Sequence, residues 1–256
     1  PLLFEVRRCA PNPESLAALL ADLGDKAAGL IVEPMVQGAA GMRMHPASFL
    51  IAARDLTRER GLPLIADEVM TGFGRTGRLF ACNHGDVTPD LLCLAKGLTG
   101  GIFPLAATLA TEEIFEAFLS EDKARAFFHG HTFMAHPVGC AVALASLEIT
   151  LSEDTPGKLN AIGETIRGEL QPLESNPNVS DLRHLGGIVA FDLHPPAGDE
   201  AGYMAKMSAS LRAASIERGV LLRPLGNVLY AMPPACTTPD QARQIGRVMA
   251  ELVTLP

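Results

Sequence analysis

Short apolar runs alternate with amphipathic segments along the first part of the chain. The run 62–69 (LPLIADEV) is apolar up to two adjacent carboxylates, a pattern typical of a strand buried on both faces of a parallel sheet. Residues 12–25 and 47–60 have the apolar spacing of amphipathic helices. This alternation predicts an α/β fold with a mostly parallel sheet, whose other strands we expect at 26–33, 90–96 and 101–111.

Residues with capping propensity mark the ends of these helices. Asn12 is a candidate N-cap for the first helix, and Gly24 is its stop signal. Thr111 is expected to cap a helix over 111–119. Pro137 is expected to open a helix that reaches about residue 151.

The pattern changes near residues 152–157, where the parallel-sheet alternation ends. Beyond it we expect a long helix to about residue 174, an antiparallel strand pair over 179–193, a helix over 200–218, short strands at 220–224 and 228–234, and a last helix from Thr238. Thr238 and Gln241 have the spacing of a capping box. The sequence therefore predicts two units: 1–152, the C-terminal part of a large α/β domain, and 153–256, a small α+β domain.

Composition narrows the class of function. Hydrophobic residues make up 48% of the chain, and the formal net charge is −8 with no run of basic residues, so nucleic acid and anionic membranes are disfavoured as partners. The five cysteines are odd in number and lack C-x-x-C spacing, which indicates neither a disulfide framework nor a zinc site. A reducing compartment, the cytoplasm, and small-molecule chemistry are the expectation.

The beginning of the chain is unlike a secretory leader. No basic segment followed by an apolar one opens it, and no apolar run approaches the length of a membrane span. The chain begins with Pro1 rather than Met, and residues 1–6 (PLLFEV) resemble a strand entered partway. We therefore expect a fragment of a longer protein.

Charged residues follow three of the predicted strands. Asp67 and Glu68 end one strand, Lys96 ends the next, and Glu33 ends the first. Open α/β sheets bind ligands at this edge, and isolated charges are costly to bury, so a chemical use is favoured. Pyridoxal phosphate catalysis needs such a pair, because a lysine holds the cofactor as a Schiff base and an aspartate pairs with its ring nitrogen. Lys96 could also act as general base.

Two other functions, dinucleotide binding and metal binding, are each suggested by part of a sequence pattern. Gly72, Gly74 and Gly77 match the G-x-G-x-x-G dinucleotide pattern, but the residues that follow lack the helical periodicity that this fingerprint requires. The loop 127–140 contains three histidines, whose spacing is not a recurrent metal-ligand pattern and which no carboxylate joins: His129, His131 and His136. We expect no metal site. The same loop, lying before a helix, offers the donors of an anion site.

Arg223 is the candidate site residue of the second unit. It lies between an apolar run and Pro224, which restricts its backbone, and its planar guanidinium suits a carboxylate. The alternative is a surface arginine whose stem covers apolar area.

The chain resembles the class III pyridoxal-phosphate aminotransferases of fold type I. The resemblance is carried by IVEPMVQGAAGM, LIADEVMTGFGRTG, KGLTGG and the HGHTF loop. A narrower resemblance, to the branch whose acceptor is a keto-amino acid, rests on GMRMHPASFL, FPLAATLAT and LLRPLGNVLYAMPP. It is spread over most of the chain.

The resemblance implies roles for individual residues. Lys96 would bind the cofactor covalently and Asp67 would pair with its ring nitrogen. His131 and Thr132 would meet the cofactor phosphate from the neighbouring subunit of a homodimer. Gly130 and Arg223 would contact the keto-amino acid, with Arg223 taking its carboxylate. His131 and His136 replace a proline and an asparagine that are frequent in the family.

The resemblance also implies a portion of the family's chain that precedes these residues. That portion carries the Gly-Ser phosphate loop and the aromatic residue that stacks on the cofactor ring. The alternatives within the class are ω-aminotransferases of the ornithine, 4-aminobutyrate or β-alanine type and an aminomutase. Outside enzymes, the alternative is a truncated chain that only dimerises.

Overall fold

Two β-sheets with flanking helices make up the protein, whose computed structural model describes residues 4–195, 201–202 and 204–254. A four-stranded sheet has the order β1-β4-β5-β6, with β1, β4 and β5 parallel and β6 antiparallel to β5. Its strands are β1 (Leu30–Val32), β4 (Leu64–Asp67), β5 (Leu91–Leu94) and β6 (Ala107–Ala110). The predicted α/β sheet is confirmed, with one antiparallel edge.

Helices of the first part form where the pattern predicts them. They are α1 (Pro13–Leu23), α2 (Ala47–Arg58), α3 (Glu112–Glu116) and α4 (Pro137–Ser152). The Asn12 side chain accepts a hydrogen bond from the Ser15 N–H at 2.8 Å, which confirms the predicted cap. Short 3-10 turns are η1 (Gly24–Lys26), η2 (Ala81–His84), η3 (Lys96–Thr99) and η4 (Lys123–Arg125), and a small hairpin is formed by β2 (Val36–Gln37) and β3 (Arg43–Met44).

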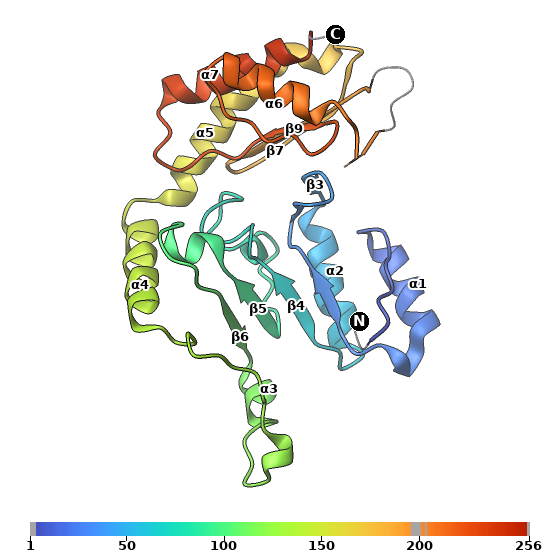
Figure 1. The fold of residues 1–256 in the computed structure, drawn as a ribbon. Helices are drawn as coiled ribbons and strands as arrows, with labels where there is room; N and C mark the ends of the chain where they lie inside the picture. The colour runs from blue at the N-terminus through green and yellow to red at the C-terminus, as the bar shows by residue number, and fades with distance from the viewer. Residues whose placement is uncertain (1–3, 196–200, 203, 255–256) are drawn as a thin grey trace.

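The second part is an antiparallel sheet covered by helices. Its elements are α5 (Thr155–Glu169), η5 (Gln171–Ser175), β7 (Val179–Leu185), β8 (Ile188–Leu193), α6 (Ser208–Glu217), β9 (Val228–Ala231) and α7 (Pro239–Leu252). This C-terminal unit lies above the four-stranded sheet in Figure 1, whereas α3 projects from the sheet's opposite end. The unit boundary near residue 152 stays a prediction.

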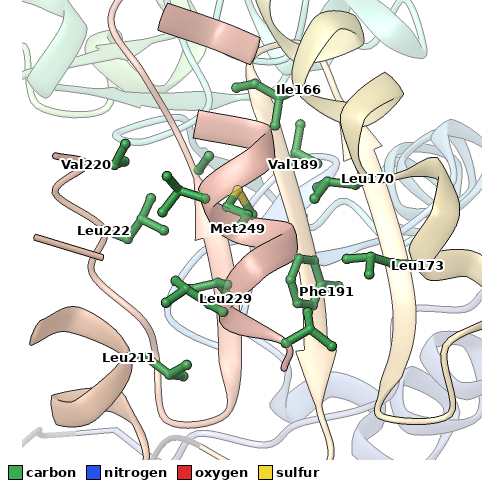
Figure 2. Packing of buried hydrophobic residues seen from close by; sticks show 14 of the residues in the cluster. Ile166, Leu170, Leu173, Val189, Phe191, Leu211, Val220, Leu222, Leu229 and Met249 are labelled. Carbon is green, nitrogen blue, oxygen red and sulfur yellow. The ribbon is translucent and has the colours of Figure 1, made fainter. Parts of the chain in front are cut away.

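Strand β8 is buried on both faces, and this gives the C-terminal unit two apolar layers. Val189 and Phe191 face one cluster, which also contains Ile166 and Leu170 of α5 and Met249 of α7. Figure 2 shows these side chains together with Leu229 of β9. Because burying such a side chain is worth about 1.5–3 kcal/mol, this layer holds α5 and α7 on the sheet. The other face of β8 packs on the β2–β3 hairpin.

The C-terminal capping box is confirmed. The Gln241 N–H donates to the Thr238 hydroxyl at 3.3 Å, and the Thr238 N–H donates to Gln241 Oε1 at 2.9 Å. This reciprocal pair satisfies two donors at the start of α7.

Three predicted elements are shorter than expected, two of them because of proline. The helix predicted to reach residue 174 ends as an α-helix at Glu169, since Pro172 cannot donate to a helical ladder, and it continues as η5. The strand predicted over 101–111 begins only after Pro104, at Ala107. Residues 111–119 form only the short helix α3, and the Thr111 side chain makes no capping hydrogen bond.

One strand prediction is wrong, and a second is wrong over the residues that the structure describes. Residues 220–224 form no strand, because Pro224 lacks an N–H and the chain then turns through Gly226, leaving a single bridge between Leu225 and Val228. Of the strand predicted over 1–6, residues 4–6 are irregular and 1–3 lie outside the described residues. The helix predicted over 200–218 is α6 only; residues 196–200 and 203 lie outside the description.

Candidate active site

The predicted acid and amine lie at the same edge of two neighbouring strands. Asp67 ends β4 and pairs in register with Cys93 of β5, and Lys96 begins η3 directly after that strand. Because β4 and β5 are parallel, both side chains lie at the carboxyl ends of their strands, where such sheets bind ligands. Glu33 follows β1, the next strand along the same edge. The structure therefore brings together the three residues as predicted.

The backbone at Lys96 is constrained. Its φ of +35° lies in the left-handed region, which non-glycine residues seldom adopt and which occurs disproportionately at functional sites. A Cβ at Gly97 would lie 2.8 Å from Phe73 Cβ, so only glycine fits there. The Ser146 hydroxyl of α4 donates to the Gly97 carbonyl at 3.2 Å. The turn is thus held from two sides.

Neither functional group of the pair is fully engaged. The Lys96 side chain is exposed, and no hydrogen-bond or ion-pair partner of its amine occurs among the described residues. Asp67 is half-buried, and its Oδ1 accepts the Val69 N–H at 3.0 Å. That bond orients the carboxylate and leaves Oδ2 without a partner in the described part of the chain. The site therefore offers one oriented acceptor and one free amine.

Glu68, next to Asp67, has a structural role. Its side chain is fully buried and accepts hydrogen bonds from the Ala81 N–H at 2.6 Å, the Cys82 N–H at 2.8 Å and the Thr71 hydroxyl at 3.2 Å. Burial raises the pKa of Glu68, although these donors act in the opposite direction. Burial and the nearby Glu68 charge also raise the pKa of the Cys82 thiol. Glu68 therefore anchors the loop that follows β4.

Glu33 anchors a different loop. Its Oε2 accepts the Gly38 N–H at 2.9 Å. The contact ties the β2–β3 hairpin to the edge of the sheet.

The Gly-rich segment after β4 serves packing between the two parts of the chain. Gly74 has a φ of +92°, and a Cβ there would lie 3.1 Å from the Pro156 backbone nitrogen. A Cβ at Gly77 would overlap the Asn160 side chain. The residues after Gly77 form turns and the short 3-10 helix η2, not the α-helix that the dinucleotide fingerprint requires.

Arg75, in the same segment, is a half-buried charged group whose contact the local sequence pattern does not predict. Its guanidinium donates to the Pro233 carbonyl at 2.8 Å, and burial lowers its pKa. No carboxylate pairs with it among the described residues. The feature of the sequence that could have drawn attention to Arg75 is a charged residue inside the G-x-G-x-x-G pattern.

The loop containing Gly130, His131 and Thr132 lies away from Lys96 in the same chain. Strand β6 runs antiparallel to β5, so the chain leaves the sheet beside Asp90, at the edge opposite Lys96, where the Thr111 N–H donates to the Asp90 carbonyl at 3.0 Å. All three loop residues are exposed. The structure does not bring them to the acid and amine within one chain.

The three histidines of this loop have separate contacts. His131 Nδ1 accepts the Phe133 N–H at 3.1 Å, and His136 accepts the Gly139 N–H at 3.4 Å while stacking on Phe103. The His129 ring lies against Phe127. No group of three potential ligands that could hold a metal ion occurs within the described residues.

Arg223 lies in the C-terminal unit and is exposed. Its guanidinium has no ion-pair or hydrogen-bond partner in the described part of the chain. It lines an open pocket of about 630 Å³ together with residues that include Leu222, Tyr230, Met232, Pro233 and Gln241. A mixed apolar and polar pocket with one unpaired guanidinium can hold a carboxylate on an apolar chain.

Within the described residues, no helix combines the length and the apolar character needed to cross a bilayer.

Comparison with known proteins places this geometry in a family. The family model described as aminotransferase class-III matches residues 5–253. The adenosylmethionine-8-amino-7-oxononanoate aminotransferase of Synechococcus elongatus is 47% identical over 97% of the chain and 56% of its own length. That of Geobacter sulfurreducens is 43% identical over 84% of the chain and 48% of its own length. The chain therefore spans about half the length of the curated relatives it matches.

Solved structures agree. An amine transaminase from an uncultivated Pseudomonas species, in its PLP-bound form, is 36% identical with a TM-score of 0.86, over 94% of this chain and 55% of that one. The adenosylmethionine-8-amino-7-oxononanoate aminotransferase of Methanocaldococcus jannaschii is 32% identical with a TM-score of 0.87, over 94% of this chain and 57% of that one. These likenesses confirm the predicted fold type I. With a lysine and an aspartate at adjacent strand ends and a family match over nearly its whole length, the chain belongs to the class III aminotransferases.

Proposed function

We propose that this chain carries the catalytic lysine and aspartate of a pyridoxal-phosphate-dependent aminotransferase. The reaction would transfer an amino group from S-adenosylmethionine to 8-amino-7-oxononanoate and form 7,8-diaminononanoate, a step of biotin biosynthesis. The observation that carries the proposal is the pair formed by Asp67 and Lys96 at neighbouring strand ends, each with a free polar atom. The names of the relatives support the choice of substrates.

The residues present fit the cofactor. An aldehyde needs an unengaged amine, and Lys96 offers one on a constrained turn. A ring nitrogen that must stay protonated needs an oriented carboxylate, and Asp67 has one oxygen held by Val69 and the other free. Pyridoxal phosphate, when bound, supplies an electron sink for the electron pair of the substrate Cα–H bond.

The chain's own residues then have distinct tasks. Asp67 Oδ2 would accept the ring N–H and keep that nitrogen cationic. Lys96 would hold the cofactor between turnovers, and its ε-amine would move the proton from the substrate Cα as a general base. Glu68 keeps the Phe73 loop against Gly97, which fixes the direction of the Lys96 side chain.

Arg223 is proposed to bind the distant carboxylate of the keto-amino acid. That carboxylate lies far from the reacting ketone, so its cation has to come from another part of the protein. The free guanidinium and the partly apolar lining of the Arg223 pocket meet this need. Gly130 is proposed to contact the same substrate across the subunit interface.

Replacing the Arg223 guanidinium should slow the half-reaction with the keto-amino acid selectively. Arg223→Ala should cost about 2–4 kcal/mol in kcat/KM for the keto-amino acid, and Arg223→Lys should also raise KM because an ammonium cannot form a bidentate contact. The half-reaction with S-adenosylmethionine should lose less. Single-turnover kinetics of each half-reaction in the full-length protein measure this, with the exposed Arg247→Ala as control.

An equal loss in both half-reactions would make Arg223 a shared anchor and would favour a general ω-aminotransferase. That second candidate has a specific observation behind it, since the amine transaminase is more similar in sequence than the Methanocaldococcus jannaschii enzyme. A profile of amino donors separates the two: turnover with S-adenosylmethionine supports the main proposal, and turnover with simple amines alone contradicts it.

A homodimer with shared active sites is part of the proposal. The segment 111–136, which we call the projecting segment, extends from the sheet in Figure 1 and exposes large apolar side chains: Phe115, Phe118, Leu119, Phe127, Phe128, Phe133 and Met134. Exposed apolar area of this extent is typical of an association surface. A second copy covering it would let His131 and Thr132 reach the cofactor phosphate of the other subunit. The unpaired cysteines suit the proposed cytoplasmic location.

Thr132→Ala should lower cofactor affinity about tenfold to a hundredfold, because a charge-assisted hydrogen bond worth about 1.5–3 kcal/mol is lost. Equilibrium binding of the cofactor measures this, and Thr165→Ala, at a half-buried threonine of α5, is the control.

Mixed dimers test the cross-subunit contact directly. Pairing a Lys96→Ala subunit with a Thr132→Ala subunit puts both lesions into one site and leaves the other intact. At cofactor concentrations that saturate only intact sites, half of the wild-type activity is expected. Activity no higher than that of the Thr132→Ala dimer would show that each subunit serves its own site.

A further inference from the structure

The β2–β3 hairpin joins the sheet that carries Lys96 to the unit that carries Arg223. Its buried residues pack with side chains of η2, β8 and β9 in one apolar cluster: Met35, Val36, Met42, Ala81, Ile188, Ala190 and Val228. A Cβ at Gly41, in the hairpin turn, would lie 3.1 Å from Val228 Cγ2. The two parts of the chain therefore meet at close range here.

Arg183 of β7 fastens this contact. Its side chain is 7% exposed, and its Nε donates to the Met42 carbonyl at 2.9 Å while Nη2 donates to the Gly41 carbonyl at 2.5 Å. Two carboxylates of its own unit flank the guanidinium. Asp181 Oδ2 lies 3.0 Å from Nη1, and Asp192 Oδ1 lies 2.7 Å from Nη2 without hydrogen-bond alignment.

The turn needs this donor. Gly41 and Met42 both have positive φ, +95° and +54°, and their N–H groups both donate to the Gly38 carbonyl. The carbonyls of Gly41 and Met42 accept hydrogen bonds from two N–H groups of the Arg183 guanidinium, whose planar arrangement of donors suits two neighbouring acceptors. A lysine ammonium lacks that geometry. Arg183 thus stabilises a turn conformation that is otherwise unfavourable.

The hairpin contact lies between the part of the chain that holds Lys96, the proposed reacting amine, and the part that holds Arg223, the proposed carboxylate-binding residue. On one side, Glu33 ties the hairpin to the sheet edge that holds Asp67 and Lys96. On the other side, Val228 of β9 exchanges both backbone hydrogen bonds with Leu225, two residues after Arg223. Both sides of the hairpin contact are thus fixed by hydrogen bonds.

We propose that Arg183 is a positioning residue that sets the spacing between Lys96 and Arg223 and thereby selects the chain length of the carboxylate substrate. The inference rests on the proposed function, because it requires that Arg223 binds the distant carboxylate of the substrate. A fixed spacing between amine and guanidinium admits one chain length best. If the hairpin is released, the C-terminal unit can shift and accept neighbouring lengths.

The test compares three keto-amino acids: 8-amino-7-oxononanoate and its homologues that are one methylene shorter and one methylene longer. In the full-length wild-type holoenzyme, kcat/KM should favour one length by about tenfold or more over the others. In Arg183→Met this ratio should fall to about threefold or less, with KM for the best substrate rising more than kcat falls. Arg218→Met is the matched control, because Arg218 pairs with Glu251 inside the C-terminal unit.

The outcomes separate the two claims. A wild-type protein that turns over none of the three acids contradicts the proposed function, and the inference falls with it. Wild-type discrimination that persists unchanged in Arg183→Met overturns the inference alone. A merely structural loss would lower kcat/KM for all three lengths by the same factor, which also overturns it.

A second variant and a second measurement cover poor folding of Arg183→Met. Arg183→Lys keeps the charge and should give an intermediate ratio. Hydrogen exchange of the Gly41 and Met42 amides should become faster in both variants, while exchange in β4 stays at the wild-type rate. Folded variants with unchanged exchange at these two amides would contradict the role of Arg183.

Discussion

Replacing Lys96 by alanine should abolish turnover in the full-length protein. The variant loses both the amine that binds the cofactor and the general base that moves the Cα proton, so activity should fall by about 10⁴-fold or more. The cofactor should still bind non-covalently. Borohydride should fix the cofactor to Lys96 in the wild-type protein and to no residue in the variant, as peptide mass spectrometry measures.

The control for this prediction is Lys26→Ala, because Lys26 is exposed in η1, outside the site. It should keep wild-type activity and borohydride labelling. Normal turnover in Lys96→Ala, or labelling at a different lysine, would contradict the assignment of the site.

The sequence was sufficient to predict this pair because each residue ends an apolar run. Strands buried on both faces read as continuous apolar runs, and parallel strands deliver their carboxyl ends to one edge. Asp67 and Lys96 were therefore predictable as neighbours from local pattern alone. The same reasoning located Glu33 but left its task open, and only its bond to Gly38 shows that it supports the hairpin.

Contacts between the two parts of the chain were not predictable in this way. Arg183 lies in a strand whose pattern predicts only that it pairs with β8, whereas its donors reach carbonyls more than a hundred residues earlier in the chain. Arg75 likewise meets Pro233 through tertiary packing. Local periodicity carries no information about such partners, since they depend on how separately formed elements dock.

The failed strand at 220–224 has a similar origin. Its apolar residues Val220 and Leu222 are buried as expected, but they pack as irregular chain into the C-terminal core. Pro224 removes a ladder donor, so burial is achieved without strand pairing. This leaves Arg223 exposed at the pocket rather than paired into a sheet.

Asp67→Asn should reduce kcat/KM by about 10²- to 10⁴-fold, equivalent to about 3–5 kcal/mol of transition-state stabilisation, because the ring nitrogen loses the carboxylate that keeps it protonated. Asparagine keeps an oxygen that can accept the Val69 N–H, so the side chain should keep its orientation and the fold should keep its stability. The loss should therefore be electrostatic. Steady-state kinetics and thermal unfolding of the full-length variant measure the two quantities.

A cofactor analogue separates the charge from the geometry at this position. Pyridoxal phosphate methylated at the ring nitrogen carries a permanent positive charge and needs no protonating partner. It should restore part of the activity of Asp67→Asn but none of the activity of Lys96→Ala. Glu33→Gln is the control, because that carboxylate lies at the same edge but is engaged with Gly38. If the methylated cofactor restores nothing in Asp67→Asn, the carboxylate does more than hold the ring nitrogen cationic, and the task assigned to Asp67 is wrong.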